Sequence, residues 1–405
     1  MTTVQNRLRS YGPGVFVAAA LIVLGFLYPK YVESLANLSV IGEFIPSLSS
    51  MVIMIAFTMM AVGLNIVVGY AGLLDLGYVA FYAVGAYTAA WFASQQFDQW
   101  TFHFGSVGIS KETPGIHLSI WLVLIMAGAL TAASGILIGL PTLRLRGDYL
   151  AIVTLGFGEI IPQVVRNGDN VFGFDLTHGT FGISPIDSPG FGSIGEKLGL
   201  PLSYQQSFQR EQWFYWTALA LLLFTVFCSV RLRDSRLGRA WIAIREDETA
   251  AAAMGVPLMR TKTWSYAIGA FFGGVAGAFY SSFRSGAFPA DFYFNISVFL
   301  LCMVILGGMG SIWGVILGGM ILGYLNVAGL ATFGSKLQEA GVDFDPTKYQ
   351  FGFYGIIIVL MMLFRPEGLI PERRHRRELQ LGVHDTPLYD VTREGTLTDR
   401  DPEND

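Results

Sequence analysis

Charge is scarce in this chain. Charged residues occupy 14% of the 405 positions and hydrophobic residues 53%, whereas an ordinary soluble domain is roughly 25% charged. Apolar stretches of about 20 residues, the length that crosses a bilayer core, recur from the first few dozen residues nearly to the end. Such a chain cannot cover its apolar surface in water, so the composition argues against a soluble globular class and predicts an all-α polytopic membrane protein.

Cysteine and histidine are also sparse. Cys228 and Cys302 both lie in apolar stretches, where they are typical of small buried side chains and not of a disulfide or metal pair. The five histidines fall in loops, near a span end or in the tail: His103, His117, His178, His375 and His384. Catalytic and metal sites need converging side chains. We therefore expect no metal and no catalytic residue, and an intramembrane enzyme with Asp75 and Glu159 as an acid pair fits poorly.

About ten stretches qualify as transmembrane or partly membrane-embedded helices. They are Pro13–Leu27, Met51–Val68, Leu73–Phe92, Ile116–Leu140, Leu150–Val165, Trp213–Val230, Trp264–Phe283, Ile296–Ile312, Val315–Ala331 and Phe351–Phe364. The first is interpreted as a retained helix, because no small-residue cleavage site follows it. The third, fifth and last are irregular or short, which is typical of partial spans or broken helices.

The basic residues predict the orientation, because loops that stay in the cytoplasm are enriched in Lys and Arg. With ten crossings and both termini cytoplasmic, sixteen basic residues before the distal tail lie inside and eight lie outside. We divide the chain into a transmembrane permease domain, 1–372, and a disordered acidic cytoplasmic tail, 373–405. Two loops are long enough to carry function: 166–212 outside, and 231–263 inside.

Glycine is abundant and partly periodic. Gly269, Gly273 and Gly277 recur every four residues, as do Gly310, Gly314 and Gly318. This spacing places the glycines on one helix face, where they let helix backbones approach closely within a membrane. Tight packing inside one subunit and an interface between subunits are both consistent with the pattern.

A phosphate-binding loop is missing. No Gly-rich stretch ends in Gly-Lys followed by Ser or Thr, the Walker A pattern. If ATP drives the protein, another polypeptide must therefore bind it. The charged inner loop is the natural docking surface for it. Residues 236–255 contain an Ala-rich run that favours a helix, Gly255 is a plausible end cap, and Pro257 prevents continuation. A solvated amphipathic connector is the alternative interpretation.

Five ordered blocks carry a family resemblance. The block Leu237–Gly255 resembles the coupling segment of branched-chain amino-acid ABC permeases, whose pattern reads approximately LGRAW, AIREDE, AA and then MG. The blocks 63–87, 143–161, 304–311 and 364–371 are similar to the same family in the same order. The resemblance spans roughly residues 50 to 371. Importers of this family contain two permeases, and the resemblance is closest to the second, LivM-type permease.

That resemblance implies the partners and the coupling residues. It implies a second homologous permease, two ATP-binding subunits and an extracytoplasmic solute-binding protein, with ATP on the partner subunits, no cofactor on this chain, a membrane-lipid environment and no nucleic acid. The coupling residues that it implies are Gly238, Arg239, Ala240, Trp241, Arg245, Glu246, Asp247, Glu248 and Gly255. The expected function is import of branched-chain or related small amino acids across the bacterial inner membrane by alternating access.

Other solutes and mechanisms remain open. Related permeases also serve urea and short amides, and an ATP-independent secondary transporter would lack Walker A equally well. The chain departs from the family where Thr177–Ile183 replaces a Thr-Gly-Gly-x-x-Gly-Ile turn, and it only approximates the general Glu-Ala-Ala importer consensus. Docking of a binding protein at that turn is therefore less well supported.

Two acids in apolar stretches, Glu159 and Asp75, are the single residues that most suggest a function, because ionisable groups in a membrane are costly. Glu159 would either contact solute or satisfy backbone donors freed by a helix break near Pro162. Asp75 would either line the pathway or cap a short helix. The predicted pathway residues are Asn65, Tyr70, Asp75, Tyr78, Tyr82 and Glu159.

Overall fold

The architecture is seen in a computed structural model that describes residues 25–32 and 44–371, except 106–108, 111, 146, 172 and 343. The predicted first span, apart from 25–27, and the predicted tail 373–405 lie outside the described residues. The main helices are α2 (Leu48–Asn65), α3 (Val79–Phe92), α4 (Ile120–Thr142), α5 (Asp148–Arg166), α6 (Gly192–Glu196), α7 (Arg210–Arg233), α8 (Arg236–Glu246), α9 (Glu248–Ala253), α10 (Leu258–Arg284), α11 (Phe294–Gly307), α12 (Ile312–Tyr324), α13 (Leu330–Glu339) and α14 (Gln350–Phe364).

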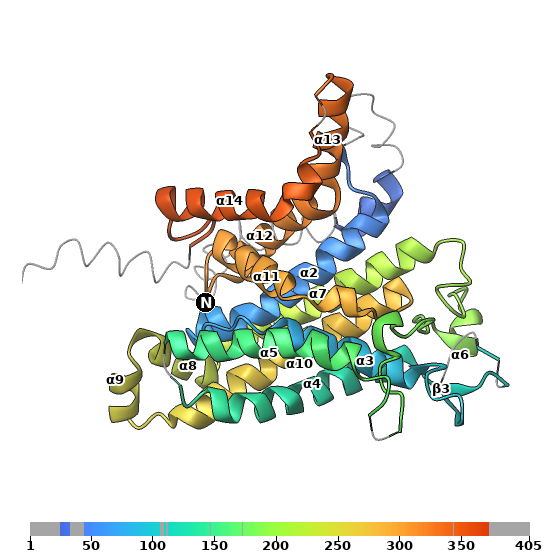
Figure 1. The fold of residues 1–405 in the computed structure, drawn as a ribbon, viewed down its shortest axis with the longest axis horizontal. Helices are drawn as coiled ribbons and strands as arrows, with labels where there is room; N and C mark the ends of the chain where they lie inside the picture. The colour runs from blue at the N-terminus through green and yellow to red at the C-terminus, as the bar shows by residue number, and fades with distance from the viewer. Residues whose placement is uncertain are drawn as a thin grey trace, which may run out of the picture.

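Long helices run side by side along the molecule (Figure 1). Within the described residues, six helical stretches are long and apolar enough to cross a membrane, and they include α2, α4, α5 and α7. Helices α3 and α11 are shorter but apolar, and the 27 residues of α10 extend about 40 Å. The chain is thus mostly helical and polytopic, as predicted.

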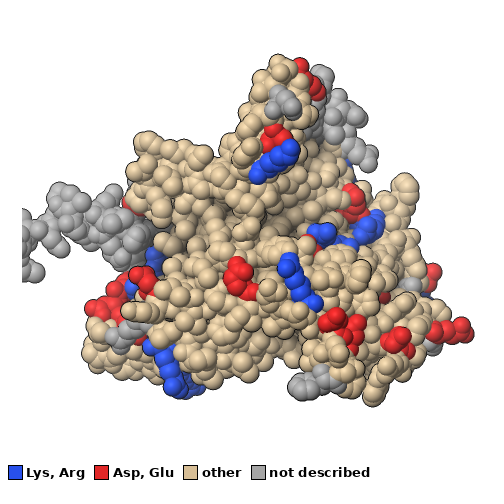
Figure 2. All heavy atoms as spheres, viewed as in Figure 1, with Lys and Arg blue, Asp and Glu red and all other residues tan. Residues whose placement is uncertain are grey.

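The two ends of the bundle differ. Helices α8 and α9 lie together at one end, which we call the coupling end, whereas α6 and strand β3 lie at the opposite end (Figure 1). Charged side chains are most frequent toward the two ends of the face shown in Figure 2, and a few acidic and basic side chains also lie nearer its middle and on the projection above it. This distribution is the one expected of a chain that exposes its ends to water and its middle to a bilayer.

Helix α10 is central, and small residues set its contacts. It packs against α2, α3 and α4. A Cβ on Gly85 of α3 would lie 2.1 Å from the carbonyl oxygen of Gly274, and one on Gly277 would lie 2.3 Å from the carbonyl oxygen of Tyr82. On α12, a Cβ on Gly318 would meet the carbonyl oxygen of Met303 at 2.5 Å. The periodic glycines at these positions therefore serve packing inside the subunit, the first of the two alternatives.

A small sheet departs from the all-α prediction. Strands β1 (Ala93–Ser94), β3 (Gly115–Leu118) and β2 (Thr101–Phe104) pair in that order, β3 antiparallel to β1 and parallel to β2. The predicted span Ile116–Leu140 begins inside β3, and its helix starts only at residue 120. We call the described residues of 93–119 and 167–209 the cap, because they gather at the end opposite α8 and α9 (Figure 1).

Two predicted spans are shorter in the structure. Residues 71–78 are not helical: α2 continues through a π-helical turn, η2 (Ile66–Tyr70), and α3 begins only at Val79. Residues 308–311 likewise separate α11 from α12, which continues through a second π-helical turn, η5 (Leu325–Gly329), into α13. Three 3-10 turns complete the described elements: η3 (Gly179–Phe181), η4 (Pro289–Phe292) and η6 (Pro346–Tyr349).

Candidate functional site

The non-helical segment 71–78 is held inside the bundle by side chains from distant helices. The backbone N–H of Leu76 donates to the hydroxyl of Thr154 on α5 at 3.1 Å. The backbone N–H of Val79 donates to the hydroxyl of Ser297 on α11 at 2.9 Å. Irregular backbone at membrane depth requires such partners, because no water is present to satisfy it. The segment is therefore anchored to the core, with Asp75 and Gly77 buried, although Gly72 and Leu74 are exposed.

Asp75 is the buried acid of this segment. It is 1% exposed, and its Oδ1 accepts the backbone N–H of Gly77 at 2.9 Å. This contact stabilises a local turn, whereas the first turn of α3 has no side-chain cap. The predicted cap of a short helix is thus wrong in detail, because the accepted N–H lies before the helix begins. Oδ2 has no hydrogen-bond partner among the described residues.

Two further polar atoms near the coupling-end half of the core lack partners within the described chain. They are Nδ2 of Asn65 and the hydroxyl of Tyr266. The Asn65 Oδ1 accepts the backbone N–H of Gly310 at 2.9 Å, which joins α2 to the break before α12. Buried polar groups are rarely left unpaired, so these atoms mark a region suited to water or to rearrangement.

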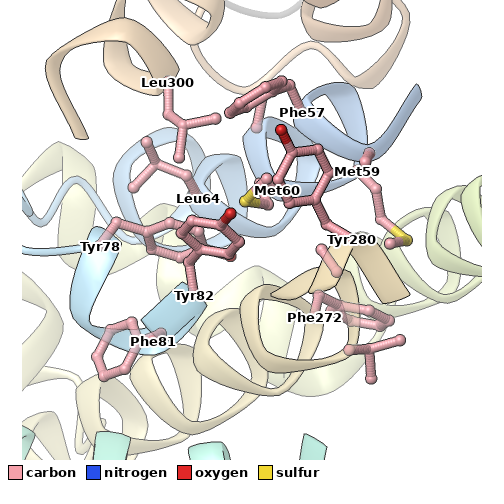
Figure 3. Close-up of a cluster of buried hydrophobic side chains, with 14 of the residues drawn as sticks. Phe57, Met59, Met60, Leu64, Tyr78, Phe81, Tyr82, Phe272, Tyr280 and Leu300 are labelled. Carbon is pink, nitrogen blue, oxygen red and sulfur yellow. The ribbon is translucent and has the colours of Figure 1, made fainter. Parts of the chain in front are cut away.

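The predicted pathway tyrosines pack inside the subunit. Figure 3 shows Tyr78 and Tyr82 beside Tyr280 and Leu300 in a cluster of buried side chains. The Tyr78 hydroxyl donates to the carbonyl of Gly269 at 2.8 Å, and the Tyr82 ring lies 6.0 Å from that of Tyr280.

Tyr70 is also in the core, and its hydroxyl is 3.1 Å from that of Ser229. Apart from Glu159, every predicted pathway residue is buried within this one subunit: Asn65, Tyr70, Asp75, Tyr78 and Tyr82. The structure does not bring Glu159 into their cluster.

Glu159 instead lies on an exposed face of α5. Helix α5 is continuous through Glu159 and Pro162, so the alternative that Glu159 satisfies donors at a helix break is wrong. The opposite face of α5 packs on the segment 71–78, where a Cβ on Gly77 would meet the carbonyl oxygen of Thr154 at 2.3 Å. Side chains on one helical face are three or four residues apart, which directs Glu159 outward.

Sequence reasoning missed two neighbours of Glu159. Gln163 and Asn167 follow at intervals of four, are also exposed, and line with Glu159 a surface groove of about 620 Å³. The Asn167 Nδ2 donates to the carbonyl of Gln163 at 2.9 Å. We call Glu159, Gln163 and Asn167 the polar stripe. The spacing of four was readable from the sequence, but the direction of the face was not.

The coupling segment is two helices and not one. Ser235 caps α8 by accepting the N–H of Gly238, and Asp247 breaks the helix with φ −154° and ψ 112°. Its carboxylate accepts the hydroxyl and N–H of Thr249 and the N–H of Ala250. These hydrogen bonds, that of the Thr249 hydroxyl foremost, lower the pKa of Asp247. Asp247 therefore remains a charged cap for α9.

The coupling segment is also not freestanding. Trp241 of α8 is fully buried, and its Nε1 donates to the carbonyl of Thr261 on α10 at 2.8 Å. Lys262, with a side chain only 3% exposed, pairs with Glu248 of α9 at 2.8 Å. These contacts fasten α8 and α9 to the start of α10, because the indole and the ammonium both need partners when buried.

Arg245 links the predicted coupling segment to η2 and the segment 71–78. Its Nη1 donates to the carbonyl of Gly69 in η2 at 2.5 Å. Gly72, at φ +67°, packs directly on the Arg245 side chain, so that a Cβ there would lie 2.8 Å from Arg245 Cγ. Three residues further on is Asp75. A displacement of α8 would thus act on the segment 71–78 without an intermediate element.

Other coupling residues face outward. Arg239, Glu246, Asp247 and Gly255 are exposed, as is Met254, whose side chain is 85% exposed. Gly238 and Ala240 are buried and half-buried, respectively, with α8 packed on α7 and α10. The segment therefore has an inner face that contacts the bundle and an outer face that is exposed.

The cap contains a charged cluster that the sequence did not indicate. Nδ1 of His117 lies 2.8 Å from Oδ2 of Asp187, and the His103 ring stacks on the His117 ring with centroids 5.0 Å apart. Burial lowers the pKa of His117, but the hydrogen bond and charge of Asp187 outweigh it, and the pKa rises above 6.5. Burial also raises the pKa of Asp187, against the opposing effect of His117.

Comparisons with known proteins agree with the fold. The family described as "Branched-chain amino acid transport system / permease component" matches residues 47–362. The LivM permease protein of the high-affinity branched-chain amino acid transport system of Escherichia coli is 37% identical over 341 residues, or 81% of this chain and 70% of that protein. Its Salmonella typhimurium counterpart is 36% identical, over 80% of this chain and 70% of that protein.

A second type of permease protein is also similar. The LivH protein of Salmonella typhimurium is 29% identical over 175 residues, which cover 43% of this chain and 51% of that protein. No solved structure matches the chain.

Proposed function

The chain belongs to the branched-chain amino acid transport permease family, and from this premise we propose that it is one permease subunit of an ABC importer for branched-chain or related small amino acids. It is a multi-pass protein of the bacterial plasma membrane. Its family consists of transport permeases and not of enzymes. ATP is bound by partner subunits, and this chain binds no cofactor.

The polar stripe carries the proposal. A carboxylate exposed on a membrane-spanning helix is costly against acyl chains, yet Glu159 lies on the outer face of α5 with Gln163 and Asn167. The outer face of α4 exposes apolar side chains such as Ile125 and Leu137, whereas on α5 the polar stripe lies among exposed apolar side chains such as Ile160. The α5 face therefore lines one wall of the pathway, and a second, homologous permease supplies the opposite wall. Similarity to both LivM and LivH proteins supports such a pair.

Transport follows alternating access driven at the coupling end. We place this end in the cytoplasm, because α7 and α8 carry Arg231, Arg233, Arg236 and Arg239 there. The outer face of α8 and α9 docks on the ATP-binding partner. Arg245 then transmits the movement to Gly69 and the segment 71–78, which packs on Thr154 and Gly158 of α5, next to Glu159 in the chain.

Uptake by the complete importer tests the pathway assignment. Glu159→Gln is expected to lower the rate of leucine uptake into proteoliposomes about tenfold or more, because a hydrogen bond to a charged group contributes about 1.5–3 kcal/mol. Glu196→Gln, an exposed acid in α6 of the cap, is the matched control and should leave uptake unchanged. Wild-type uptake by the Glu159→Gln importer would remove this face from the pathway.

ATP hydrolysis tests the coupling assignment. Reversing the charges of Arg245, Glu246 and Asp247 together should abolish solute-stimulated ATP hydrolysis while the chain remains inserted, because both faces of the segment lose their partners. Reversing Glu196 and Lys197 at the far end is the control. Unchanged stimulation in the reconstituted complex, or solute transport by this chain with no ATP-hydrolysing partner, would contradict the importer proposal and favour a secondary transporter.

The solute is set mainly by the extracytoplasmic solute-binding protein. The proposed class is leucine, isoleucine, valine or a relative, because the similar LivM proteins are permeases for branched-chain amino acids. Calorimetry of that binding protein with leucine, urea and short amides distinguishes the alternatives. Tight binding of urea or an amide, with none of leucine, would reassign the substrate within the same family.

A further inference from the structure

A second groove lies on the side of the bundle formed by α4, α7 and α10. Its volume is about 470 Å³. Its lining is almost entirely apolar, and the residues that define it are Ala132, Phe227, Cys228, Arg231, Trp264 and Phe271. Because Arg231 is two residues from the end of α7 and Trp264 is in the first turns of α10, the polar end of the groove lies toward the coupling end.

At the coupling end of the groove, no acidic lining residue balances the positive charge of Arg231. Arg231 is exposed, and its guanidinium lies over the Phe227 ring at 5.5 Å from the centroid. No acidic residue lines the groove. The nearest acid along the chain, Asp234, pairs with Arg233 at 3.3 Å. Arg231 thus presents a cation above an apolar groove, with no ion-pair partner in the described part of the chain.

The surroundings of the groove are those of a lipid-facing surface. Phe224 of α7 is exposed on the same helical face as Cys228, one turn away. The exposed side chains of α4, such as Leu137, are apolar, in contrast to the polar stripe on α5. Trp264 is 45% exposed, and tryptophan is enriched where a membrane meets water. An arginine at this depth reaches the headgroup layer with its charged end while its stem lies on apolar surface.

The helix at 25–32 does not fill the groove. It contacts α7 at Leu219 and Tyr215. Leu219 and Cys228 are separated by about two and a half helical turns and therefore lie on opposite sides of α7. Among the described residues, the groove is consequently open on the flank of α7 away from this helix.

We infer that the groove holds an acyl chain of an anionic phospholipid from the cytoplasmic leaflet, and that Arg231 binds the lipid phosphate. Basic residues between membrane helices on the cytoplasmic side bind anionic headgroups in this way, and charge complementarity selects an anionic lipid over a zwitterionic one. The leaflet assignment rests on the orientation proposed above. The occupied groove would join α4 and α10 to α7 just before α7 leads into α8.

Native mass spectrometry of the purified importer, titrated with phosphatidylglycerol or phosphatidylcholine, tests this site. Arg231→Gln should weaken phosphatidylglycerol binding about fivefold, the effect of one basic residue near a membrane surface, and leave phosphatidylcholine binding unchanged. Arg231→Lys should retain most of the preference. The matched control is Arg233→Gln, two residues away and already paired with Asp234.

Filling the groove separates lipid binding from a general charge effect. Ala132→Phe should remove the tightly bound lipid of either type, in a complex that elutes and melts like the wild type. Equal effects of Arg231→Gln and Arg233→Gln, or full lipid retention by Ala132→Phe, would overturn the assignment. Because the readout is bound lipid and not uptake, failure here leaves the importer proposal standing.

Discussion

Lys262 illustrates how a single buried charge fastens the coupling segment. Its side chain is 3% exposed, whereas that of its partner Glu248 is 26% exposed. Removing one partner of a buried ion pair leaves an uncompensated charge, and this is more costly than removing both. The pair is therefore asymmetric: the cation depends on the carboxylate more than the carboxylate depends on the cation.

We predict that Glu248→Gln destabilises the chain by about 3 kcal/mol and Lys262→Met by less, about 1–2 kcal/mol. The double variant should be more stable than Glu248→Gln alone, because it leaves no unpaired ammonium. Denaturant unfolding of the purified chain in detergent, followed by tryptophan fluorescence, measures all three. A larger loss for Lys262→Met than for Glu248→Gln would contradict the burial argument.

At the scale of elements, the cap sheet is tied to the loop after α5 by a titratable pair. Strand β3 carries His117, and Asp187 comes from the segment 167–209. The pKa values of both groups are raised in the folded chain, so the folded state binds more protons than the unfolded state. Stability must then fall as pH rises.

The pH window follows from the direction of each shift. The stabilisation by protonated His117 is fully present below its ordinary pKa of 6.5 and is lost as pH rises through the higher folded pKa. We predict that hydrogen exchange of β3, corrected for the intrinsic rate, is slower at about pH 6 than at about pH 9. His117→Asn should flatten this dependence, and His178→Asn, an exposed histidine of the same cap, should preserve it. An equally steep profile in His117→Asn would exclude this pair as the cause.

At the scale of the whole molecule, the spanning helices α4 and α5 expose surfaces that differ in polarity. The α5 face is polar at Gln163, while the α4 face exposes Leu137, which is 73% exposed. In a complex of two permeases, the first surface must meet protein or water, and the second can meet acyl chains. The arrangement predicts which side of the subunit is covered in the assembled importer.

Photo-crosslinking from within the complex measures that prediction. Benzoylphenylalanine at Gln163 should form a covalent product with the second permease, and the same probe at Leu137 should form none. Both positions are exposed on spanning helices, so they differ mainly in their direction. Crosslinks to the second permease from Leu137 but not from Gln163 would place the interface on the α4 face and contradict the prediction.

The sequence by itself determined the class of the molecule and predicted a helical segment at 236–255, where the structure has α8 and α9. Apolar runs of spanning length are local, and so are the signals of that segment, the Ala-rich run and the glycine that follows it. Local patterns also predicted which glycines permit close packing. They were less reliable where helices are interrupted, as at 71–78, because a buried non-helical segment is permitted only by distant partners such as Thr154 and Ser297.

Only the tertiary structure decided which side chains face one another. The chain places Glu159 outward and Tyr78 inward, pairs His117 with Asp187, and sets Arg245 on the carbonyl of Gly69. None of these contacts joins sequence neighbours, and helical periodicity fixes the faces of a helix without fixing what each face meets. The physical reason is that burial and pairing depend on how helices pack, which is set by the whole bundle at once.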